Sequence, residues 1–579
     1  MPQGRRKTPF SGKAKKEQLK AKKQLKSFEF GGDQKKALLV EQQKNDEASS
    51  SIRKINFQPV KDTARSNKYV LQFYNESKEE LKERREFARQ SLIHVTEKEL
   101  EIVGENYFLK ELDFPKRPPW SFNMSREQLE QKEQKYFKEY INNIEEKFSW
   151  KELSFFELNL ETWRQLWRVL EMSDIVLFIV DIRFAGLMFP PSLYDYVANV
   201  LKKDMILILN KIDLSPVPLV AAWKDYFTEK YPKLHVLMFT TMPGYNLLGK
   251  QNDKAGLQIR RRKGRLRMAA EGTQLLLDAC KEIVGNNVDL STWQEKIKEE
   301  TMLEFEEDDT REVGETIAIN QDVGYFEHEK YKGGVLTIGC LGQPNVGKSS
   351  VMNAIMGKKV VSVSKTPGHT KHFQTIFLTN NVRLCDCPGL IFPSKVPKPL
   401  QVLMGSFPIA QLKEPFTTIR YLAERLDLVK LLRIDHPDGD DEWSAMDVCD
   451  GWAKKRGYIT AKAARLDSYR AANSLLRMAL DGKICLSLMP PNYVARKDYW
   501  KNHPSTDVIK WILARKTEED DNDTAGSDIS DEDMDSKPAV GSGDTKQKKL
   551  PTDQESESNS DNDDHINFIN KFAVLNTEG

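Results

Sequence analysis

The 579-residue sequence lacks the features of a membrane or secreted protein. It has no run of about 18 apolar residues, which argues against a transmembrane helix. Lysines follow its first residues where a secretory signal would have an apolar stretch. Its six cysteines include no Cys-x-x-Cys pair, so neither a zinc site nor a disulfide scaffold is expected. These absences predict a reduced, intracellular, soluble protein.

The formal net charge is only +2, but the two ends of the chain differ in sign. Residues 1–56 form a basic, Lys-rich tail and residues 516–579 an acidic, Ser-rich tail, and both are predicted to be disordered. The basic tail is either a solvated segment, a nuclear or nucleolar address, or an arm that contacts RNA, and the last two interpretations are favoured. An acidic residue three positions after Ser530, Ser558 and Ser560 suggests phosphorylation by acidophilic kinases.

In the rest of the chain, the pattern of apolar residues changes twice. Residues 57–159 have sparse apolar positions at helical spacing and are predicted to be mostly helical. Residues 160–400 contain long apolar runs separated by helical segments. Residues 401–515 are predicted to be a helical C-terminal domain, with a helix that ends near Gly482.

Five apolar runs in residues 160–400 predict strands: Ile175–Val180, Met205–Leu209, His235–Phe239, Val335–Leu341 and Val382–Cys385. Strands that are apolar on both faces and alternate with helices indicate a parallel sheet covered by helices on both sides. The fold class is therefore predicted to be α/β, flanked by helical segments and charged tails. The helix Leu160–Met172 places four large apolar side chains on one face, which we interpret as a packing surface: Trp163, Leu166, Trp167 and Leu170.

Two charged insertions lie within residues 242–330. A basic patch begins at Arg260, and an acidic patch begins at Glu304. Both are expected to be surface loops. Contact of the basic patch with RNA and a simple solvated loop are equally compatible with the sequence.

A P-loop pattern follows the fourth predicted strand and opens a predicted helix. The pattern is Gly, four residues, Gly-Lys-Ser, and its members are Gly342, Gln343, Pro344, Asn345, Val346, Gly347, Lys348 and Ser349. Its glycines let backbone N–H groups approach phosphate oxygens, and the helix N-terminus adds positive charge. Lys348 is predicted to reach the β and γ phosphates, and Ser349 is predicted to bind Mg²⁺.

Two further motifs are predicted to sense the γ-phosphate. The first follows the fifth predicted strand and consists of Asp386, Cys387, Pro388, Gly389 and Leu390. Asp386 is placed to hold Mg²⁺ through water, and Gly389 offers its backbone N–H to the γ-phosphate. Thr370, between the P-loop and Asp386, is the candidate switch threonine that binds Mg²⁺, although a plain loop is the alternative. Lys348, Thr370 and Gly389 are the predicted catalytic residues.

The residues that follow the second predicted strand are those expected of a guanine-binding loop: Asn210, Lys211, Ile212 and Asp213. The carboxylate of Asp213 can accept hydrogen bonds from N1–H and from the exocyclic amine of guanine. Adenine presents the opposite polarity, so Asp213 disfavours ATP. Thr240 and Thr241 are weaker candidates for a second wall of the base site, through their backbone amides.

The order of these motifs is unusual, because the guanine loop precedes the P-loop. A chain whose termini have moved to other exposed loops can still build the same sheet. The sequence resembles the circularly permuted GTPase family, which includes ribosome-assembly GTPases, over most of the chain, from about Phe57 to Trp500. The segments that carry the resemblance are Phe114–Ser121, Leu160–Glu171, Gly368–Thr370 and Asp386–Pro393.

The resemblance implies the same site residues as the motifs do, with GTP, GDP and Mg²⁺ as ligands. It also implies a stimulatory potassium ion near Asn345. The residues after the first strand, Asp181-Ile182-Arg183-Phe184, depart from the small residue that many family members have after the Asp. Leu390 stands where ordinary GTPases have a water-orienting Gln, so slow hydrolysis is expected, helped by potassium or by a group from a partner.

The favoured function is a slow GTPase switch in assembly of the large ribosomal subunit, with a pre-ribosomal particle or rRNA as partner and the nucleus or nucleolus as its location, with shuttling to the cytoplasm. The alternative is a GTP-dependent signalling or scaffold protein that binds protein partners through its helical domain and tails, without RNA. A P-loop kinase or ATPase is disfavoured by Asp213. No membrane partner is expected.

Overall fold

The computed structural model describes residues 76–241, 270–302, 329–357, 360–361, 374–460 and 465–513. These residues belong to one compact unit, Met1–Lys516, and the second unit, Thr517–Gly579, lies outside the described residues. Both predicted charged tails and both charged insertions therefore also lie outside the described residues.

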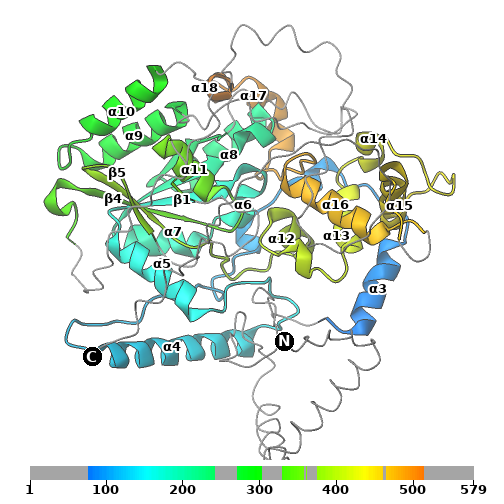
Figure 1. Cartoon of the computed structure of the whole chain (residues 1–579), viewed down its shortest axis with the longest axis horizontal. Helices are drawn as coiled ribbons and strands as arrows, with labels where there is room; N and C mark the ends of the chain where they lie inside the picture. The colour runs from blue at the N-terminus through cyan, green and yellow to red at the C-terminus, as the bar shows by residue number, and fades with distance from the viewer. Residues whose placement is uncertain are drawn as a thin grey trace, which may run out of the picture. The chain divides into compact units, whose positions relative to one another are not determined.

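A six-stranded sheet forms the centre of the described part, in the order β3-β2-β1-β4-β6-β5 (Figure 1). Its strands are β1 (Ile175–Asp181), β2 (Asp204–Asn210), β3 (Leu234–Met238), β4 (Leu336–Gly342), β5 (Gln374–Thr379) and β6 (Val382–Asp386). All neighbouring pairs are parallel except β5 and β6, which are antiparallel. The five predicted strands are confirmed to within one residue at each end, and the predicted α/β class is confirmed with them.

The strand β5 is the one part of this sheet that the sequence analysis missed. It is an edge strand in which Ile376 and Leu378 are buried while Gln374 and Phe377 are exposed. Half-buried alternation is weaker than the continuous apolar runs of the central strands, which are buried on both faces. Only two residues separate β5 from β6, so the pair forms a tight hairpin.

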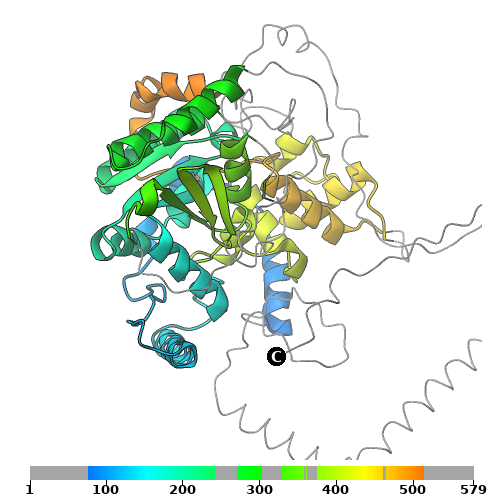
Figure 2. The same cartoon turned by 60° about the vertical axis from the view of Figure 1, so that its left-hand side comes forward.

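Helices cover both faces of the sheet (Figures 1 and 2). The helix α5 (Leu160–Met172) packs on β4 from one side, and its four large apolar side chains are buried as predicted. On the other side lie α9 (Ala270–Val284), α10 (Ser291–Met302) and α11 (Lys348–Met356). The helices between the first three strands are α6 (Ala185–Met188), α7 (Pro191–Asp195) and α8 (Val217–Lys230).

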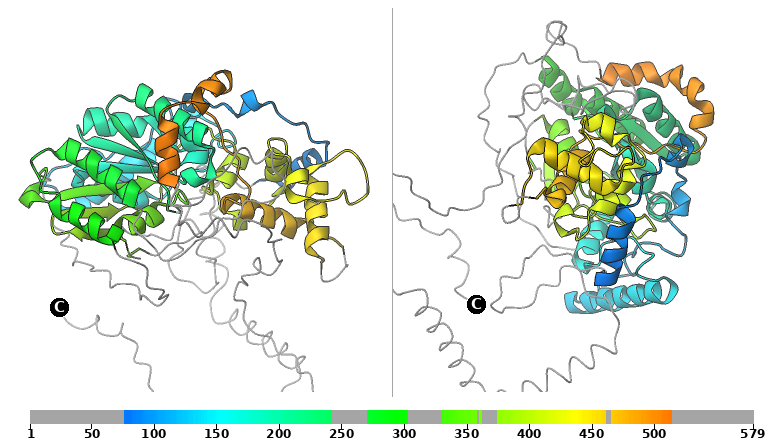
Figure 3. Two further views of the ribbon diagram at one scale, coloured as in Figure 1. Left: turned by 90° about the horizontal axis from the view of Figure 1, so that it is seen from above. Right: turned by 90° about the vertical axis from the view of Figure 1, so that its right-hand side faces the viewer.

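The C-terminal part is helical, as predicted. Its helices are α12 (Lys398–Met404), α13 (Phe416–Ala423), α14 (Leu428–Leu432), α15 (Ala445–Arg456), α16 (Ser468–Leu480), α17 (Lys497–Lys501) and α18 (Ser505–Leu513). The helices α12, α13, α15 and α16 pack on one another, whereas α17 and α18 return to pack on α8 (Figure 3). The predicted boundary at residue 400 falls inside α12. Gly482 follows the end of α16 with a φ of +76°, as a C-terminal capping glycine should.

The N-terminal region is less helical than predicted over its described residues. It contains two α-helices, α3 (Lys78–Ala88) and α4 (Arg126–Lys147), and the residues between and after them are largely irregular. Pro115, Pro118 and Pro119 lie in that irregular stretch and prevent a continuous helix.

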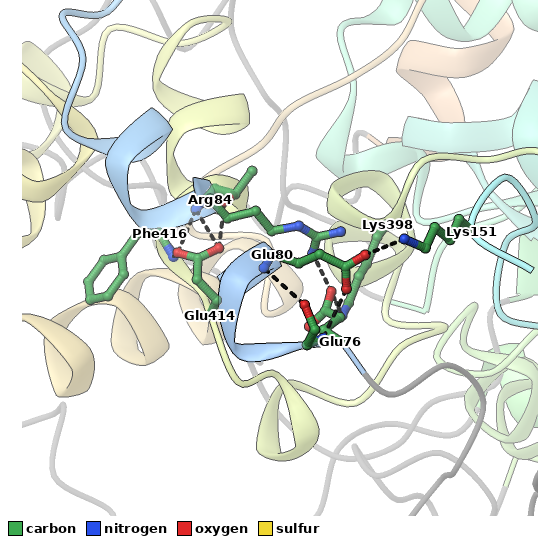
Figure 4. A network of polar contacts seen from close by, with 9 residues as sticks. Glu76, Glu80, Arg84, Lys151, Lys398, Glu414 and Phe416 are labelled. Carbon is green, nitrogen blue, oxygen red and sulfur yellow. Dashed lines mark hydrogen bonds and ion pairs between the residues drawn. The ribbon is translucent and has the colours of Figure 1, made fainter. Parts of the chain in front are cut away.

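Charged side chains connect α3 to two distant segments (Figure 4). Glu76 accepts from Lys398 at the start of α12 at 2.8 Å, and it also pairs with Arg84. Glu80 caps the helix with Ser77 and pairs with Lys151 at 2.6 Å. The network therefore joins α3, α12 and the segment after α4.

None of the helices within the described ranges is long and apolar enough to cross a membrane. All six cysteines are buried and free of disulfide bonds.

The aromatic contact between α5 and the segment after β6 gives a test of this packing. Trp163 is fully buried, contacts Phe392, and donates its indole N–H to the Glu157 carbonyl at 2.9 Å. Trp163→Ala is expected to lower the free energy of unfolding by about 3–5 kcal/mol, because it leaves a cavity. Phe122 is 52% exposed, so Phe122→Ala is expected to lower the free energy of unfolding by less than about 1 kcal/mol. Chemical denaturation of both variants measures the difference, and equal losses would contradict the assigned packing.

Candidate nucleotide-binding site

Polar residues and a glycine-rich loop gather at one edge of the sheet. Asp181, Asn210 and Asp386 are the last residues of β1, β2 and β6, and the P-loop begins at Gly342 at the end of β4. The carboxyl ends of these parallel strands meet at the same edge. The strand order also reverses between β1 and β4, which is where open α/β sheets bind their ligands.

The P-loop has the predicted context of strand, loop and helix. It runs from β4 into α11, and Gly347 precedes the helix with a φ of +94°. A Cβ atom on Gly347 would lie 2.5 Å from Nδ2 of Asn210, so both its backbone conformation and its surroundings require glycine. The loop thus presents backbone N–H groups at a helix N-terminus, which is an arrangement that binds phosphate.

The guanine loop lies directly against the P-loop. Nδ2 of Asn210 donates to the carbonyl of Val346 at 2.8 Å, and Nζ of Lys211 donates to the carbonyl of Asn345 at 2.7 Å. The first pair is 136 residues apart in the chain. The structure therefore brings together the two motifs whose order is inverted in the sequence.

Asp213 is fully buried at the end of this loop, and Ile212 beside it is also buried. The hydroxyl of Thr240 donates to Oδ1 of Asp213 at 2.7 Å. Thr240 thus reaches the site through its side-chain hydroxyl, whereas the sequence predicted a contact through backbone amides, and Thr241 follows it in the chain. Thr240 therefore helps to fix the orientation of the Asp213 carboxylate.

The carboxylate of Asp386 lies beside the P-loop lysine. Its Oδ1 atom accepts from Nζ of Lys348, and its Oδ2 atom is buried with no hydrogen-bond partner among the described residues. Burial raises the pKa of the Asp386 carboxyl, although the charge of Lys348 opposes that shift.

A buried carboxylate oxygen without a donor fits a divalent cation, and Ser349 supplies a hydroxyl one residue after Lys348. Asp386 and Ser349 are thus the described residues that would hold Mg²⁺, which would neutralise phosphate charge when bound. The third predicted ligand, Thr370, lies outside the described residues.

The residues after Asp386 follow the P-loop closely. The backbone N–H of Cys387 donates to the carbonyl of Cys340 in β4 at 3.2 Å, and that of Leu390 donates to the carbonyl of Gly342, the first P-loop residue, at 3.1 Å. Gly389 packs so tightly that a Cβ atom there would lie 3.1 Å from Pro344. Pro388 lies between Cys387 and Gly389 in the chain. The side chain of Leu390 is buried in the hydrophobic core, so it presents no polar group to the site.

Several contacts at the site were not predicted. Nδ2 of Asn345 donates to the carbonyl of Gly405 at 2.8 Å, and Oε1 of Gln343 accepts from Ser406 at 2.9 Å. The end of α12 therefore touches the P-loop. Asp181 accepts from Nζ of Lys211 at 2.7 Å. The sequence feature that could have indicated this contact is the position of Asp181 at the end of β1, which is level with Asn210 at the end of β2.

Comparison with known proteins agrees with this geometry. Residues 337–435 match the family model described as 50S ribosome-binding GTPase. The guanine nucleotide-binding protein-like 1 of Homo sapiens is 44% identical over 544 residues, which cover 88% of this chain and 90% of the human protein. The protein of the same name from Mus musculus is 44% identical over 536 residues, covering 86% of this chain and 88% of the mouse protein.

The chain belongs to the guanine nucleotide-binding protein-like 1 family. It is a GTP-binding protein with a circularly permuted P-loop GTPase domain, and both the predicted fold and the predicted family are confirmed. A more distant relative is Large subunit GTPase 1 of Saccharomyces cerevisiae, which is 33% identical over 398 residues, covering 66% of this chain and 58% of the yeast protein. A GNP-bound structure of YlqF from T. maritima has a TM-score of 0.32 at 17% identity, covering 57% of this chain and 97% of that chain.

The buried position of Leu390 predicts how this guanine nucleotide-binding protein-like 1 family member responds to a polar residue there. Leu390→Gln is expected to lower the free energy of unfolding by about 1–3 kcal/mol, because the glutamine side-chain amide would be placed in the apolar surroundings of a buried leucine. Its GTP turnover should stay within about threefold of the parent protein. Leu390→Met keeps the volume and serves as the control. Single-turnover hydrolysis measures the rate, and a large increase for Leu390→Gln alone would contradict hydrolysis that depends on a partner.

Asp213 gives a test of base recognition. Asp213→Asn replaces one acceptor by a donor and should lower GTP affinity at least about a hundredfold, since the amide oxygen can still accept from N1–H of guanine but the new NH2 group faces the exocyclic amine, donor against donor. Affinity for XTP, which carries a carbonyl at that position, should rise. Competition binding against GTP, XTP and ATP reports the preference. The control is Asp225→Asn, at a residue of α8 that pairs with His503, and it should leave the nucleotide preference unchanged. Unaltered GTP affinity in Asp213→Asn would exclude the role assigned to Asp213.

Proposed function

We propose that this protein hydrolyses GTP slowly by itself and acts as a nucleotide-dependent switch in assembly of the large ribosomal subunit. The observation that carries the slow rate is Leu390, a buried apolar side chain at the position that follows Asp-x-x-Gly. Lys348 and the backbone of the P-loop can stabilise phosphate charge. Apart from Asp386, which is assigned to Mg²⁺, the Asp386–Leu390 motif offers no side chain suited to orient the attacking water, so we infer that this group comes from elsewhere.

Two sources for that group fit the site. One is a potassium ion near Asn345. The side-chain nitrogen of Asn345 already donates to the carbonyl of Gly405, so the side-chain oxygen of Asn345 would be the atom that binds the ion. The other is a polar group from the bound partner. Turnover measured in potassium and in sodium distinguishes them, because a partner-supplied group predicts the same slow rate in both salts.

The ribosomal role is supported by the description of the matching family model and by the name of the yeast relative. The basic N-terminal segment supports it independently, because clustered lysines bind the phosphates of RNA. The same chemistry favours a nuclear or nucleolar location, with shuttling to the cytoplasm. The alternative, a signalling or scaffold protein without RNA, predicts binding to partners that does not weaken steeply with salt.

Gradient sedimentation tests the proposed switch. Cell extract containing the full-length protein is sedimented with a non-hydrolysable GTP analogue and, separately, with GDP. We expect co-migration with large-subunit precursors in the GTP state and at least about tenfold less in the GDP state. Ser349→Asn, which removes a predicted Mg²⁺ ligand, is the control and should stay free. Migration as a small free species in both states would favour the signalling or scaffold function.

A further inference from the structure

The Asp181 carboxylate lies between two cations at the base side of the site. Its Oδ2 atom accepts from Nζ of Lys211 at 2.7 Å and from Nη2 of Arg183 at 2.9 Å. The side chains of Asp181 and Arg183 are only 2% and 3% exposed. Burial alone would raise the pKa of the Asp181 carboxyl, but the charges of Arg183 and Lys211 outweigh it and hold that pKa well below its ordinary value. Asp181 is therefore a buried anion that fixes the Lys211 side chain.

Arg183 also contacts two places in the C-terminal part of the chain. Its Nη1 atom donates to the carbonyl of Ala479, in the last turn of α16, at 2.8 Å. Its own carbonyl accepts from the backbone N–H of Leu488 at 2.8 Å. One buried guanidinium thus connects the Asp181 carboxylate with a helix whose contacting residue lies 296 positions further along the chain.

A second contact joins the same two regions independently. Gly482, two residues after the end of α16, lies against Leu214, the residue that follows Asp213. A Cβ atom on Gly482 would lie 2.8 Å from both terminal methyl groups of Leu214. The end of α16 therefore touches the residue next to the guanine loop, and it also reaches the base side of the site through Arg183.

We propose that Asp181 and Arg183 are positioning residues that couple guanine binding to the seating of α16 on the GTPase domain. The inference rests on the proposed function, because it takes Lys211 and Asp213 to bind guanine. If the end of α16 withdraws, Arg183 loses the Ala479 carbonyl, and a buried cation with fewer partners is unfavourable. Asp181 then holds Lys211 less firmly.

Linkage makes this coupling reciprocal: a nucleotide that orders Lys211 also stabilises the seated position of α16. The helical part would in this way respond to occupancy of the base site as well as to the phosphates. Ser406 and Gly405 contact the phosphate side of the same site, so the base side and the phosphate side are each connected to a different helix.

Hydrogen exchange of full-length protein with and without GDP tests the coupling. In the parent protein, GDP should slow amide exchange in α16 about tenfold or more. In Arg183→Gln the slowing of α16 should fall below about threefold, with GDP affinity reduced about five- to tenfold, while Arg183→Lys restores part of both. Arg117→Gln removes another buried pair of an Arg with a carboxylate, that of Glu133 at 3.1 Å, and is the matched control that should behave as the parent.

The outcomes separate the inference from the function on which it rests. Absence of GDP binding by the parent protein would overturn the proposed function. GDP binding without slowing of α16, or full slowing in Arg183→Gln, would overturn the coupling. If circular dichroism shows that Arg183→Gln is unfolded, Gly482→Ala replaces it as the test variant. Because Gly482 has a positive φ and lies against Leu214, an alanine there should disturb the end of α16 without changing Arg183. Unchanged GDP affinity and unchanged slowing of α16 in Gly482→Ala would then reject the coupling.

Discussion

The hydrogen bonds from the guanine loop to the P-loop backbone are the interaction on which the rest of the site depends. In this permuted chain, Asn210 and Val346 lie 136 positions apart. No short connection holds the base side to the phosphate side. The amide of Asn210 and the ammonium of Lys211 make that connection instead, through the carbonyls of Val346 and Asn345. Because these groups are buried or half-buried, loss of either donor leaves a carbonyl without a partner, which is costly.

The same edge of the sheet is also held from the helical part of the chain. The end of α12 contacts the P-loop through Gly405 and Ser406, and the end of α16 contacts the base side through Arg183 and Gly482. Three of these four contacts involve a backbone carbonyl or a glycine, which require close approach, and the fourth joins the side chains of Ser406 and Gln343. The helical part is therefore built into the site, and a change in nucleotide state has two structural routes by which it can affect those helices.

The segment after Asp386 is held at several points along its length. The N–H of Ser154 donates to the Ser394 carbonyl at 3.0 Å, and the side-chain amide of Gln401 makes two hydrogen bonds to the backbone of Phe155. Phe392 packs among aromatic rings of the core. A segment fixed in this way cannot easily reorient to position a water molecule, and this is one reason for proposing that an additional group does so.

The sequence by itself determined most of the sheet and both nucleotide motifs. Continuous apolar runs specify buried parallel strands, and the P-loop pattern specifies a local strand–loop–helix conformation, so neither depends on distant residues. The tertiary structure alone decided the edge strand β5, the Thr240 contact with Asp213, and the contacts of Asp181, Arg183 and Ser406. The switch position Thr370 and the charged insertions remain predictions, because they lie outside the described residues. The contacts of Arg183 show why the sequence could not decide these features. Arg183 can be a buried cation only because Asp181 and the Ala479 carbonyl accept its hydrogen bonds, and no local sequence pattern indicates a partner 296 residues away.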